Sequence, residues 1–492
     1  MKTLFTMISM ALLVSCSGRV GKYNNKLSMP VAPEIELINN GNVKFDDFFL
    51  DKTMRLDYYH SGNSRADHFA MDEVVSDGIW FGSRTRLIDN LSLGLYFFEV
   101  ADKESRVILY SKGFSSVFGE WQTTGDAKDN WGTFSESLRF PWPKKPVTVA
   151  LSRRDSMNRF ERVWTIEIDP SSRQVNPADI IHTNRVDIIA ENGPADEKAD
   201  IVILGDGYSR KEMEKFRSDA ARLAGYLLET EPFRSRRGDF NIRAIETPAE
   251  TTGITKPHHK VFKRTPLSVH YSAFDSERYA LTHDNKTIRN IASQVPYDLM
   301  VIMINERTYG GGGIYNQYLT VSADNKYTRY IITHEMGHHI AALADEYYTS
   351  AVSYDLPAVT VEPWEPNVTA YLDKSNLKWK DLVESTTPLP TPWNKEAFEK
   401  EDFAVQKTRD SLRKAMVPEK IMEDLFDKQL SEEDALFASE KYNGKTGLFE
   451  GADYDAKGMY RSQTDCIMFT RHMTFCKVCR AAIERAMDQM MK

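Results

Sequence analysis

Residues 330–348 read YIITHEMGHHIAALADEYY, and this stretch says most about the fold and the chemistry of the chain. His334 and His338 are four residues apart, so on a helix both imidazoles project from one face at a separation that suits one tetrahedral zinc ion. Glu335 lies one step round the helix, where a carboxylate can act as the base for a metal-activated water. Apolar residues around the motif predict a helix packed into a core: Ile331, Ile332, Ile340, Ala341 and Leu343.

Such a helix needs a partner for its polar groups. Two histidines and a glutamate turned into a core and left unpaired would cost several kcal/mol, and a metal ion satisfies all three. In the alternative interpretation, ordinary hydrogen bonds satisfy the histidines and Glu335 forms a surface salt bridge. We favour the metal.

A zinc ion in a catalytic site has a third protein ligand and an open fourth position. Asp345 follows His338 by seven residues and reaches the metal only if the chain leaves the helix near Ala342 or Leu343. On a continued helix, Asp345 would lie about 10 Å further along the axis. We therefore predict Asp345 as the third ligand, with Glu346 as the alternative.

The rest of the chain predicts a multi-domain α+β protein. Short β-type runs separated by turn-rich segments over residues 23–170 predict an antiparallel β-sandwich. We interpret residues 171–198 as a polar linker. From residue 199 to 492, strand and helix patterns alternate as in a mixed α/β sheet domain. Within it, the charged segment 394–445 with helical spacing predicts a helical insertion.

The first 22 residues predict export. Lys2 and the apolar stretch from Leu4 to Val14 have the pattern of a secretory signal that is too short to span a bilayer. The sequence LVSC at residues 13–16 resembles the bacterial lipobox, in which the cysteine is acylated. We therefore expect a lipid anchor at Cys16 and a location on the cell envelope, periplasmic or outer-surface. An ordinary signal peptide that contains a cysteine is the alternative.

Three further cysteines lie near the C-terminus, at positions 466, 476 and 479. Outside the reducing cytosol, Cys476 and Cys479 could form a disulfide, or Cys466 could pair with either of them, and one thiol would stay odd. A zinc knuckle needs a fourth ligand, and only His472 lies nearby in the sequence, so we favour it less.

The overall charge argues against a nucleic-acid partner. The chain has 63 lysines and arginines against 71 aspartates and glutamates, a net charge of -8. It therefore lacks the positive field that binding to a phosphate backbone requires.

The segment from His334 to Tyr347, with its Asp-Glu-Tyr ending, resembles the IgA-peptidase family of zinc metallopeptidases, which belongs to the metzincin clan. The resemblance covers most of residues 199–490, and the β-rich front resembles the N-terminal domain of that family. Further matching segments are IVILGDGY (201–208), EPF (231–233), DFN (239–241), FEGA (449–452), GMYR (458–461) and DCIM (465–468).

The resemblance implies a metzincin-like α/β zinc peptidase domain. It implies zinc on His334, His338 and Asp345, a catalytic role for Glu335, and Met468 as the Met-turn under the metal site. The usual metzincin spacing would place the third ligand one residue earlier, at Ala344. Many relatives carry glycine where this chain has Ala342.

Two further features concern the substrate. We predict that Tyr460 stabilises the oxyanion, with Tyr347 as the alternative. The glycine run Tyr309–Ile314 leads into a strand-like segment at residues 315–321. Its glycines would let a peptide approach closely and pair as an added strand.

The sequence thus predicts an exported, lipid-anchored zinc endopeptidase that acts on proteins or peptides, such as immunoglobulin or other host or dietary proteins. Two alternatives stay open. One is a lipoprotein that binds host glycan or protein and has a non-catalytic metal site. The other is a zinc-dependent hydrolase of a non-peptide bond.

Overall fold

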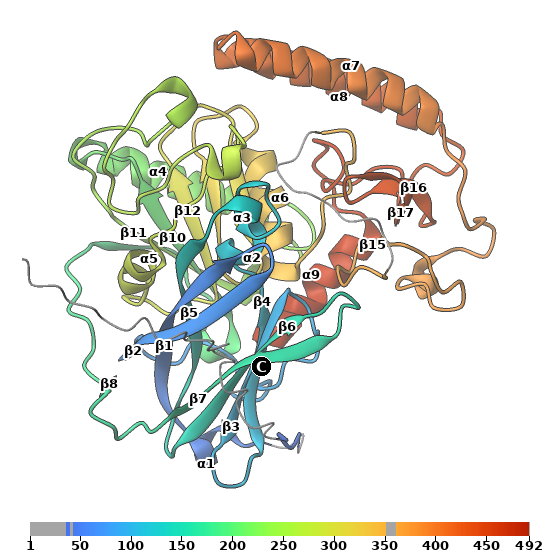
Figure 1. The fold of residues 1–492 in the computed structure, drawn as a ribbon. Coiled ribbons are helices and arrows are strands. Elements are labelled where there is room, and N and C mark those ends of the chain that lie inside the picture. Colours follow the sequence, from blue (N-terminus) through green and yellow to red (C-terminus); the bar gives the residue numbers. More distant parts are fainter. Residues whose placement is uncertain (1–35, 40–42, 351–360, 492) are drawn as a thin grey trace, which may run out of the picture. The chain divides into compact units, whose positions relative to one another are not determined.

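In the computed structural model, which describes residues 36–39, 43–350 and 361–491, two four-stranded sheets come first (Figure 1). Their inner faces share one apolar cluster that includes Leu56, Phe98, Leu138 and Val149, so the sheets pack as a sandwich. One sheet has the order β5 (Gly132–Pro143), β1 (Phe49–Asn63), β2 (Ala66–Ser76), β8 (Val175–Asn176). The other has the order β4 (Ile108–Phe114), β3 (Tyr96–Asp102), β6 (Val147–Arg154), β7 (Phe160–Ile168).

Three short helices accompany the sandwich: α1 (Phe45–Phe48), α2 (Val117–Trp121) and α3 (Asp126–Asp129). The predicted signal and Cys16 lie outside the described residues. None of the helices in the described ranges is both long and apolar enough to cross a bilayer.

A six-stranded mixed sheet forms the centre of the second part of the chain. Its inner strands are parallel, and its two edge strands run antiparallel to their neighbours. The strand order is β13 (Gly311–Ile314), β14 (Tyr318–Ser322), β12 (Leu299–Ile304), β10 (Ala199–Asp206), β11 (Phe240–Ile245), β9 (Val186–Ala190).

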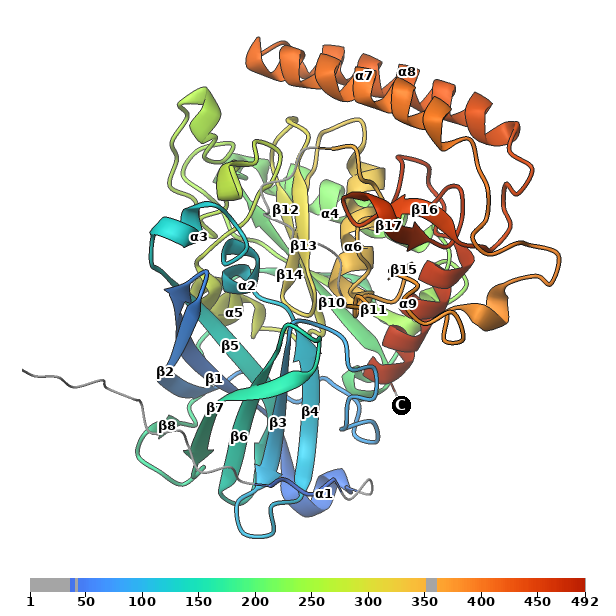
Figure 2. The same cartoon turned by 45° about the vertical axis from the view of Figure 1, so that its right-hand side comes forward.

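Alternation along β10 separates two apolar cores, because successive side chains of a strand point to opposite faces. Ile201 and Ile203 belong to the cluster that also contains residues of α4 (Met213–Leu228), α6 (Thr328–Ala341) and α9 (Lys477–Met490). Val202 and Leu204 belong to the opposite cluster, with α5 (Asn285–Ala292). The sheet is thus covered on both faces, as Figure 2 shows.

The remaining elements lie beyond the central sheet in sequence. The helices α7 (Lys395–Lys414) and α8 (Glu419–Ala438) lie side by side, within the range 394–445 for which the sequence predicts a helical insertion (Figure 1). A small sheet has the order β15 (Val368–Thr369), β17 (Asp455–Arg461), β16 (Phe449–Ala452). Single turns of 3-10 helix occur at Ala195–Glu197, Arg210–Glu212, Arg237–Asp239, Pro257–His259, Ala273–Asp275 and Lys380–Leu382.

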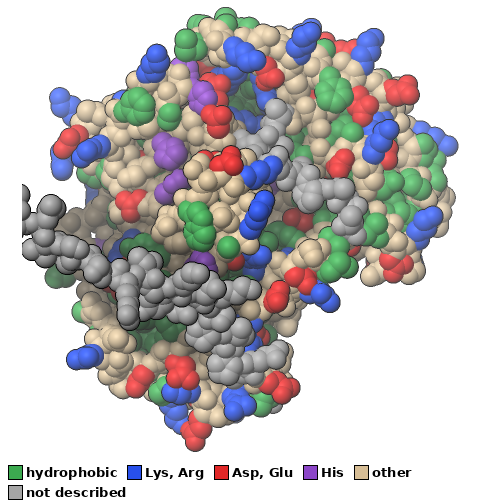
Figure 3. Space-filling view, viewed as in Figure 1, with side chains coloured by type: hydrophobic (Ala, Val, Ile, Leu, Met, Phe, Trp, Pro, Cys, Tyr) green, Lys and Arg blue, Asp and Glu red, His purple; other side chains and the backbone are tan. Residues whose placement is uncertain are grey.

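The sandwich and the central sheet belong to one compact unit, Leu37–Lys492, and polar contacts join them. The Nη2 of Arg55 donates to the Oδ1 of Asn290 at 2.6 Å, and the guanidinium of Arg139 lies 3.6 Å from the ring centroid of Tyr297. On the described part of the face in Figure 3, acidic and basic side chains are interspersed. This mixture agrees with the weak net charge of the sequence.

Two sequence interpretations differ from the structure. The segment 171–198 is not only a linker, because it contains β8 and the edge strand β9. An edge strand has one exposed side, so its polar residues resemble those of a loop. The glycine run at 309–314 does not merely precede a strand, because Gly311–Ile314 is itself the edge strand β13.

Candidate metal centre

Helix α6 carries the His-Glu-x-x-His motif and ends at Ala341, four residues before Asp345. Asn325 helps to start the helix by accepting a hydrogen bond from the N–H of Tyr327 at 2.8 Å. At the other end, Ala342 adopts the left-handed conformation, with φ 52° and ψ 37°. Its N–H donates to the carbonyl of His338 at 3.0 Å, and the chain then continues without helical structure. This turn brings the following residues back toward the histidines.

Three candidate ligand atoms meet beside the end of α6. The Nε2 atoms of His334 and His338 are 3.1 Å apart. The Oδ1 of Asp345 lies 3.0 Å from the Nε2 of His334 and 3.3 Å from the Nε2 of His338. Ligands at about 2.0–2.1 Å from a tetrahedral zinc ion stand about 3.3 Å from one another. The triangle therefore has the size of one face of a zinc tetrahedron.

The other nitrogen of each ring is held by the backbone. The Nδ1 of His334 lies 2.9 Å from the carbonyl oxygen of Ile467, and the Nδ1 of His338 contacts the carbonyl oxygen of Leu343. A carbonyl only accepts, so each Nδ1 carries a proton, and the Nε2 of a neutral ring presents a lone pair. Ligating histidines have this kind of outer hydrogen bond.

The surroundings of the Oδ1 of Asp345 show whether a metal ion fits between the three candidate ligands. The Oδ1 of Asp345 is buried and has no hydrogen-bond donor among the described residues. It faces the Nε2 atoms of both rings, so with neutral imidazoles three acceptors approach one point with no donor between them. A divalent cation relieves this repulsion and satisfies all three atoms.

The neighbours of Asp345 keep its carboxylate ionised, as a metal ligand must be. Burial acts to raise its pKa, but the neighbouring His338 and His334 lower that pKa well below the usual range of an aspartate. The other oxygen, Oδ2, accepts a hydrogen bond from the hydroxyl of Tyr454. Asp345 therefore stays ionised and fixed in orientation.

Glu335 lies beside the ligand atoms and lines a cavity of about 400 Å³. Burial raises the pKa of Glu335, and the two histidines act in the opposite direction. A carboxylate with a raised pKa is a stronger proton acceptor, which suits a general base. The cavity is also lined by Ser116 and Glu120 of the sandwich part.

Tyr347 and Tyr460, the two tyrosines named for the oxyanion, lie in different places. Tyr460 is on β17, where its ring packs 6.3 Å from that of Tyr371, and it is not among the cavity-lining residues. Tyr347 lines the cavity, and its ring lies 6.5 Å from that of His334. Burial raises the pKa of Tyr347, so its phenol stays protonated and can donate. The sequence preference for Tyr460 is therefore not supported by its position.

Two cavity residues were missed by the sequence analysis. Arg278 donates from its Nη2 to the hydroxyl of Tyr347 at 3.2 Å, and Tyr454 donates to Asp345. Both come from loops that carry no local motif, and only their contacts in the fold reveal them.

Met468 and β13 support α6 from two directions. A Cβ atom built on Gly337 would lie 3.0 Å from the Sδ of Met468, so the thioether packs directly on the helix. A Cβ on Gly313 would lie 2.5 Å from the backbone oxygen of Glu335. Glycine at both positions permits these close approaches.

Glu346, the alternative third ligand, faces away from the histidines. Its Oε1 accepts from the Nδ2 of Asn367 at 3.0 Å and lies 3.4 Å from the Sγ of Cys479. Residues 342–348 have no regular secondary structure, and consecutive side chains of a non-helical chain can point to opposite sides. The structure thus places Asp345, the preferred third ligand, at the histidines and Glu346, the alternative, at the cysteines.

Comparisons with known proteins give two family matches. The IgA peptidase M64 family matches residues 188–487, and the Peptidase M64 N-terminus family matches residues 44–165. No curated protein gives a significant match. The first match spans more than half of the chain and includes every candidate ligand. The resemblance noted in the sequence is confirmed: the chain belongs to the IgA peptidase M64 family, whose members are metal-dependent peptidases.

Proposed function

We propose that the protein is a zinc-dependent endopeptidase in which His334, His338 and Asp345 hold the metal. The observation that carries this proposal is the triangle of acceptor atoms with edges of 3.0–3.3 Å. Two imidazole nitrogens and one carboxylate as ligands, with an open fourth position, are typical of catalytic zinc. A bound zinc ion would supply a Lewis acid that polarises the scissile carbonyl and acidifies the attacking water.

The chain itself moves the protons. Glu335 takes a proton from the attacking water and later delivers it to the leaving amine. The protonated phenol of Tyr347, held by Arg278, donates to the developing oxyanion. Tyr454 keeps the carboxylate of Asp345 in place.

The edge strand β13 offers a place for an extended peptide. The N–H of Gly311 bonds to the carbonyl of Arg278 at 3.3 Å, so the segment after Arg278 already covers one end of the edge. Gly313, two residues further on, lies at the cavity and has its backbone groups on the same outer side. We infer that a substrate pairs there, beside Glu335.

Protein or peptide substrates follow from the family, and an immunoglobulin is one candidate. The experiment that tests the proposal combines zinc analysis with a mixed peptide library, on the wild type and on Glu335→Gln. We expect internal cleavage by the wild type and at least a 10²-fold loss in the variant, which keeps its zinc. Cleavage that survives in the variant would show that Glu335 is not the general base. Zinc-dependent release of acetyl groups without peptide cleavage would instead favour a non-peptide hydrolase.

We also propose that the protein is exported and lipid-anchored at Cys16. The support is the lipobox-like end of the N-terminal apolar segment. Detergent-phase partitioning of the wild type and of Cys16→Ser tests this. The wild type should enter the detergent phase and the variant should not, and equal partitioning would exclude the anchor.

A further inference from the structure

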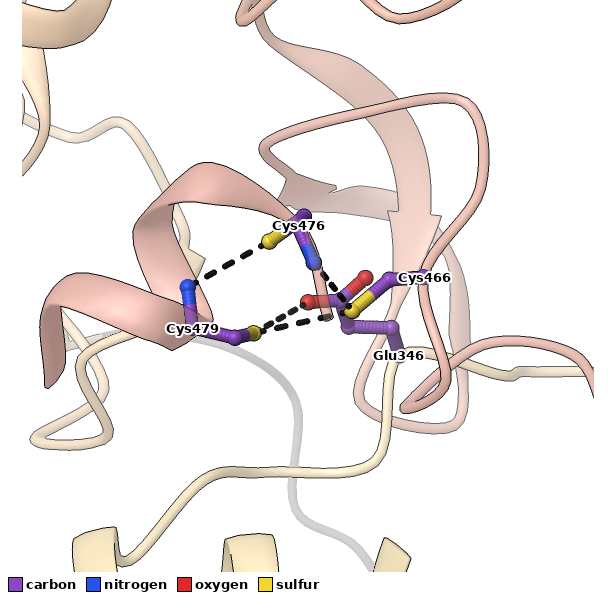
Figure 4. Close-up of side chains that lie close together, drawn as sticks. All are labelled: Glu346, Cys466, Cys476 and Cys479. Atoms are coloured by element: carbon purple, nitrogen blue, oxygen red, sulfur yellow. Dashed lines mark hydrogen bonds between the residues drawn. The ribbon is translucent and has the colours of Figure 1, made fainter. Parts of the chain in front are cut away.

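A second group of side chains with metal-ligating atoms includes Glu346, the residue after Asp345. Figure 4 shows Glu346, Cys466, Cys476 and Cys479, whose ligand atoms all lie within 4.8 Å of one another. All four residues are buried, and the most exposed of them, Cys476, is 2% accessible. They come from three segments: the chain after α6, the segment that leads to Met468, and the start of α9.

The distances fit a tetrahedral ion. The sulfur atoms of Cys466 and Cys479 are 3.7 Å apart, and the Sγ of Cys479 lies 3.4 Å from the Oε1 of Glu346. With zinc–sulfur bonds of about 2.3 Å and a zinc–oxygen bond of about 2.0 Å, tetrahedral geometry gives about 3.8 Å and 3.5 Å for these two edges. A disulfide requires its sulfur atoms at about 2.05 Å, and all three thiols are free in the structure.

One atom of the group has no partner that the protein supplies. The side chain of Glu346 is fully buried, and its Oε2 has no hydrogen-bond partner among the described residues. Leaving a carboxylate in this state is costly unless a cation balances it. The amide of Asn367 donates to Oε1, the oxygen that lies 3.4 Å from the Sγ of Cys479, and so orients the carboxylate at the sulfurs.

Backbone N–H groups donate to two of the three sulfurs. The N–H of Cys476 donates to the Sγ of Cys466 at 3.3 Å, and the N–H of Cys479 donates to the Sγ of Cys476 at 3.3 Å. Cys476 is the N-cap of the 14-residue helix α9, where the helix dipole stabilises negative charge.

We propose that Cys466, Cys476, Cys479 and Glu346 bind a second zinc ion with a structural role. Thiolates select zinc over the hard cations, and a closed set of four protein ligands is typical of structural sites. The ion would join the residue after Asp345 to the segment two residues before Met468. It would therefore fix both the third candidate ligand and the methionine under the first centre.

Metal content without any activity assay tests this proposal. We expect two zinc ions per chain in the wild type and one in the double variant His334→Ala/His338→Ala. In that double variant, Co²⁺ should give the strong near-ultraviolet absorption of cobalt–thiolate bonds. Alkylation mapped to residues 466–479 should be blocked until a chelator removes the metal, after which all three thiols react.

Variants of the second centre complete the test. Glu346→Gln should lose one zinc ion or bind it at least tenfold more weakly. Glu433→Gln, which changes a buried carboxylate in α8 away from the cluster, should keep both ions. A single zinc that disappears in the double histidine variant, or a disulfide among residues 466, 476 and 479, would overturn the proposal. Zinc at the cysteines alone would instead refute the proposed function and leave this inference intact.

Discussion

Asp345 and Glu346 are consecutive residues whose carboxylates lie at two different groups of side chains, the two histidines and the three cysteines. The Oδ1 of Asp345 lies 3.0 Å from the Nε2 of His334, whereas the Oε1 of Glu346 lies 3.4 Å from the Sγ of Cys479. The N–H of Glu346 also donates to the carbonyl of Met468 at 2.7 Å. This segment is therefore a short bridge between the candidate catalytic site and the buried cysteines, and its position depends on both.

Tyr454→Phe should weaken metal binding at the first centre. The hydroxyl of Tyr454 donates to the oxygen of Asp345 that does not face the histidines. Loss of such an outer hydrogen bond costs about 10–100-fold in metal affinity. Zinc competition with a chelator measures this, and Asp345→Asn sets the limit of complete loss. An unchanged affinity in Tyr454→Phe would show that this hydroxyl does not orient the ligand.

Tyr347→Phe should lower kcat by about 10²-fold with little change in KM, because its hydroxyl would act only on the oxyanion. Tyr460→Phe is the matched control, since Tyr460 does not line the cavity. Steady-state kinetics on one cleaved peptide compare the two variants. A larger loss of kcat in Tyr460→Phe would restore the assignment made from the sequence.

Ala342→Gly should stabilise the protein by up to about 1 kcal/mol, because glycine adopts the left-handed conformation without the steric penalty of a Cβ atom. Ala341→Gly, one residue earlier and still helical, should destabilise the protein by about 1 kcal/mol. Denaturant unfolding of the two variants gives the comparison. The same sign for both changes would contradict the structure of this turn.

Gly313→Ala should destabilise the protein by about 1–3 kcal/mol and reduce activity. The added methyl group would lie 2.5 Å from the backbone oxygen of Glu335, so β13 or α6 must move. Gly225→Ala in α4 meets no atom within 4 Å and should instead stabilise by up to about 1 kcal/mol. Thermal unfolding and cleavage rates of both variants test this contrast.

His472 should make the free energy of unfolding fall as the pH rises from about 6.5 to about 9. Burial lowers its pKa, but Asp465 and other acidic neighbours outweigh this and raise the pKa to about 9. The unfolded value is about 6.5, so the stabilisation is complete below pH 6.5 and is lost as pH rises to about 9.

His472→Gln should remove this dependence. The side chain is 18% exposed, so the effect is on the order of 1–2 kcal/mol after screening by solvent. Unfolding free energies of wild type and variant at pH 6 and pH 9.5 should differ more at pH 6. An equal difference at both pH values would show that the histidine is not charged in the folded protein.

The sequence by itself predicted the features that depend on local periodicity. His334 and His338 share a helix face because they are four residues apart, and the structure places their Nε2 atoms 3.1 Å apart. The sequence also predicted that the chain leaves the helix near Ala342, because on a continued helix Asp345 could not contact the metal. The helices α7 and α8 fall within the predicted insertion because their apolar residues repeat at helical spacing.

Only the tertiary structure decided which distant residues complete the two centres. Arg278, Tyr454 and Asn367 lie on segments without a motif, and the fold brings them beside Tyr347, Asp345 and Glu346. The sequence offered His472 as the fourth partner of the cysteines, whereas the structure pairs His472 with Asp465 and Asp434 and places Glu346 at the sulfurs. Contacts between residues that lie far apart in the sequence depend on how the sheets and helices pack, and no local pattern of side chains encodes them.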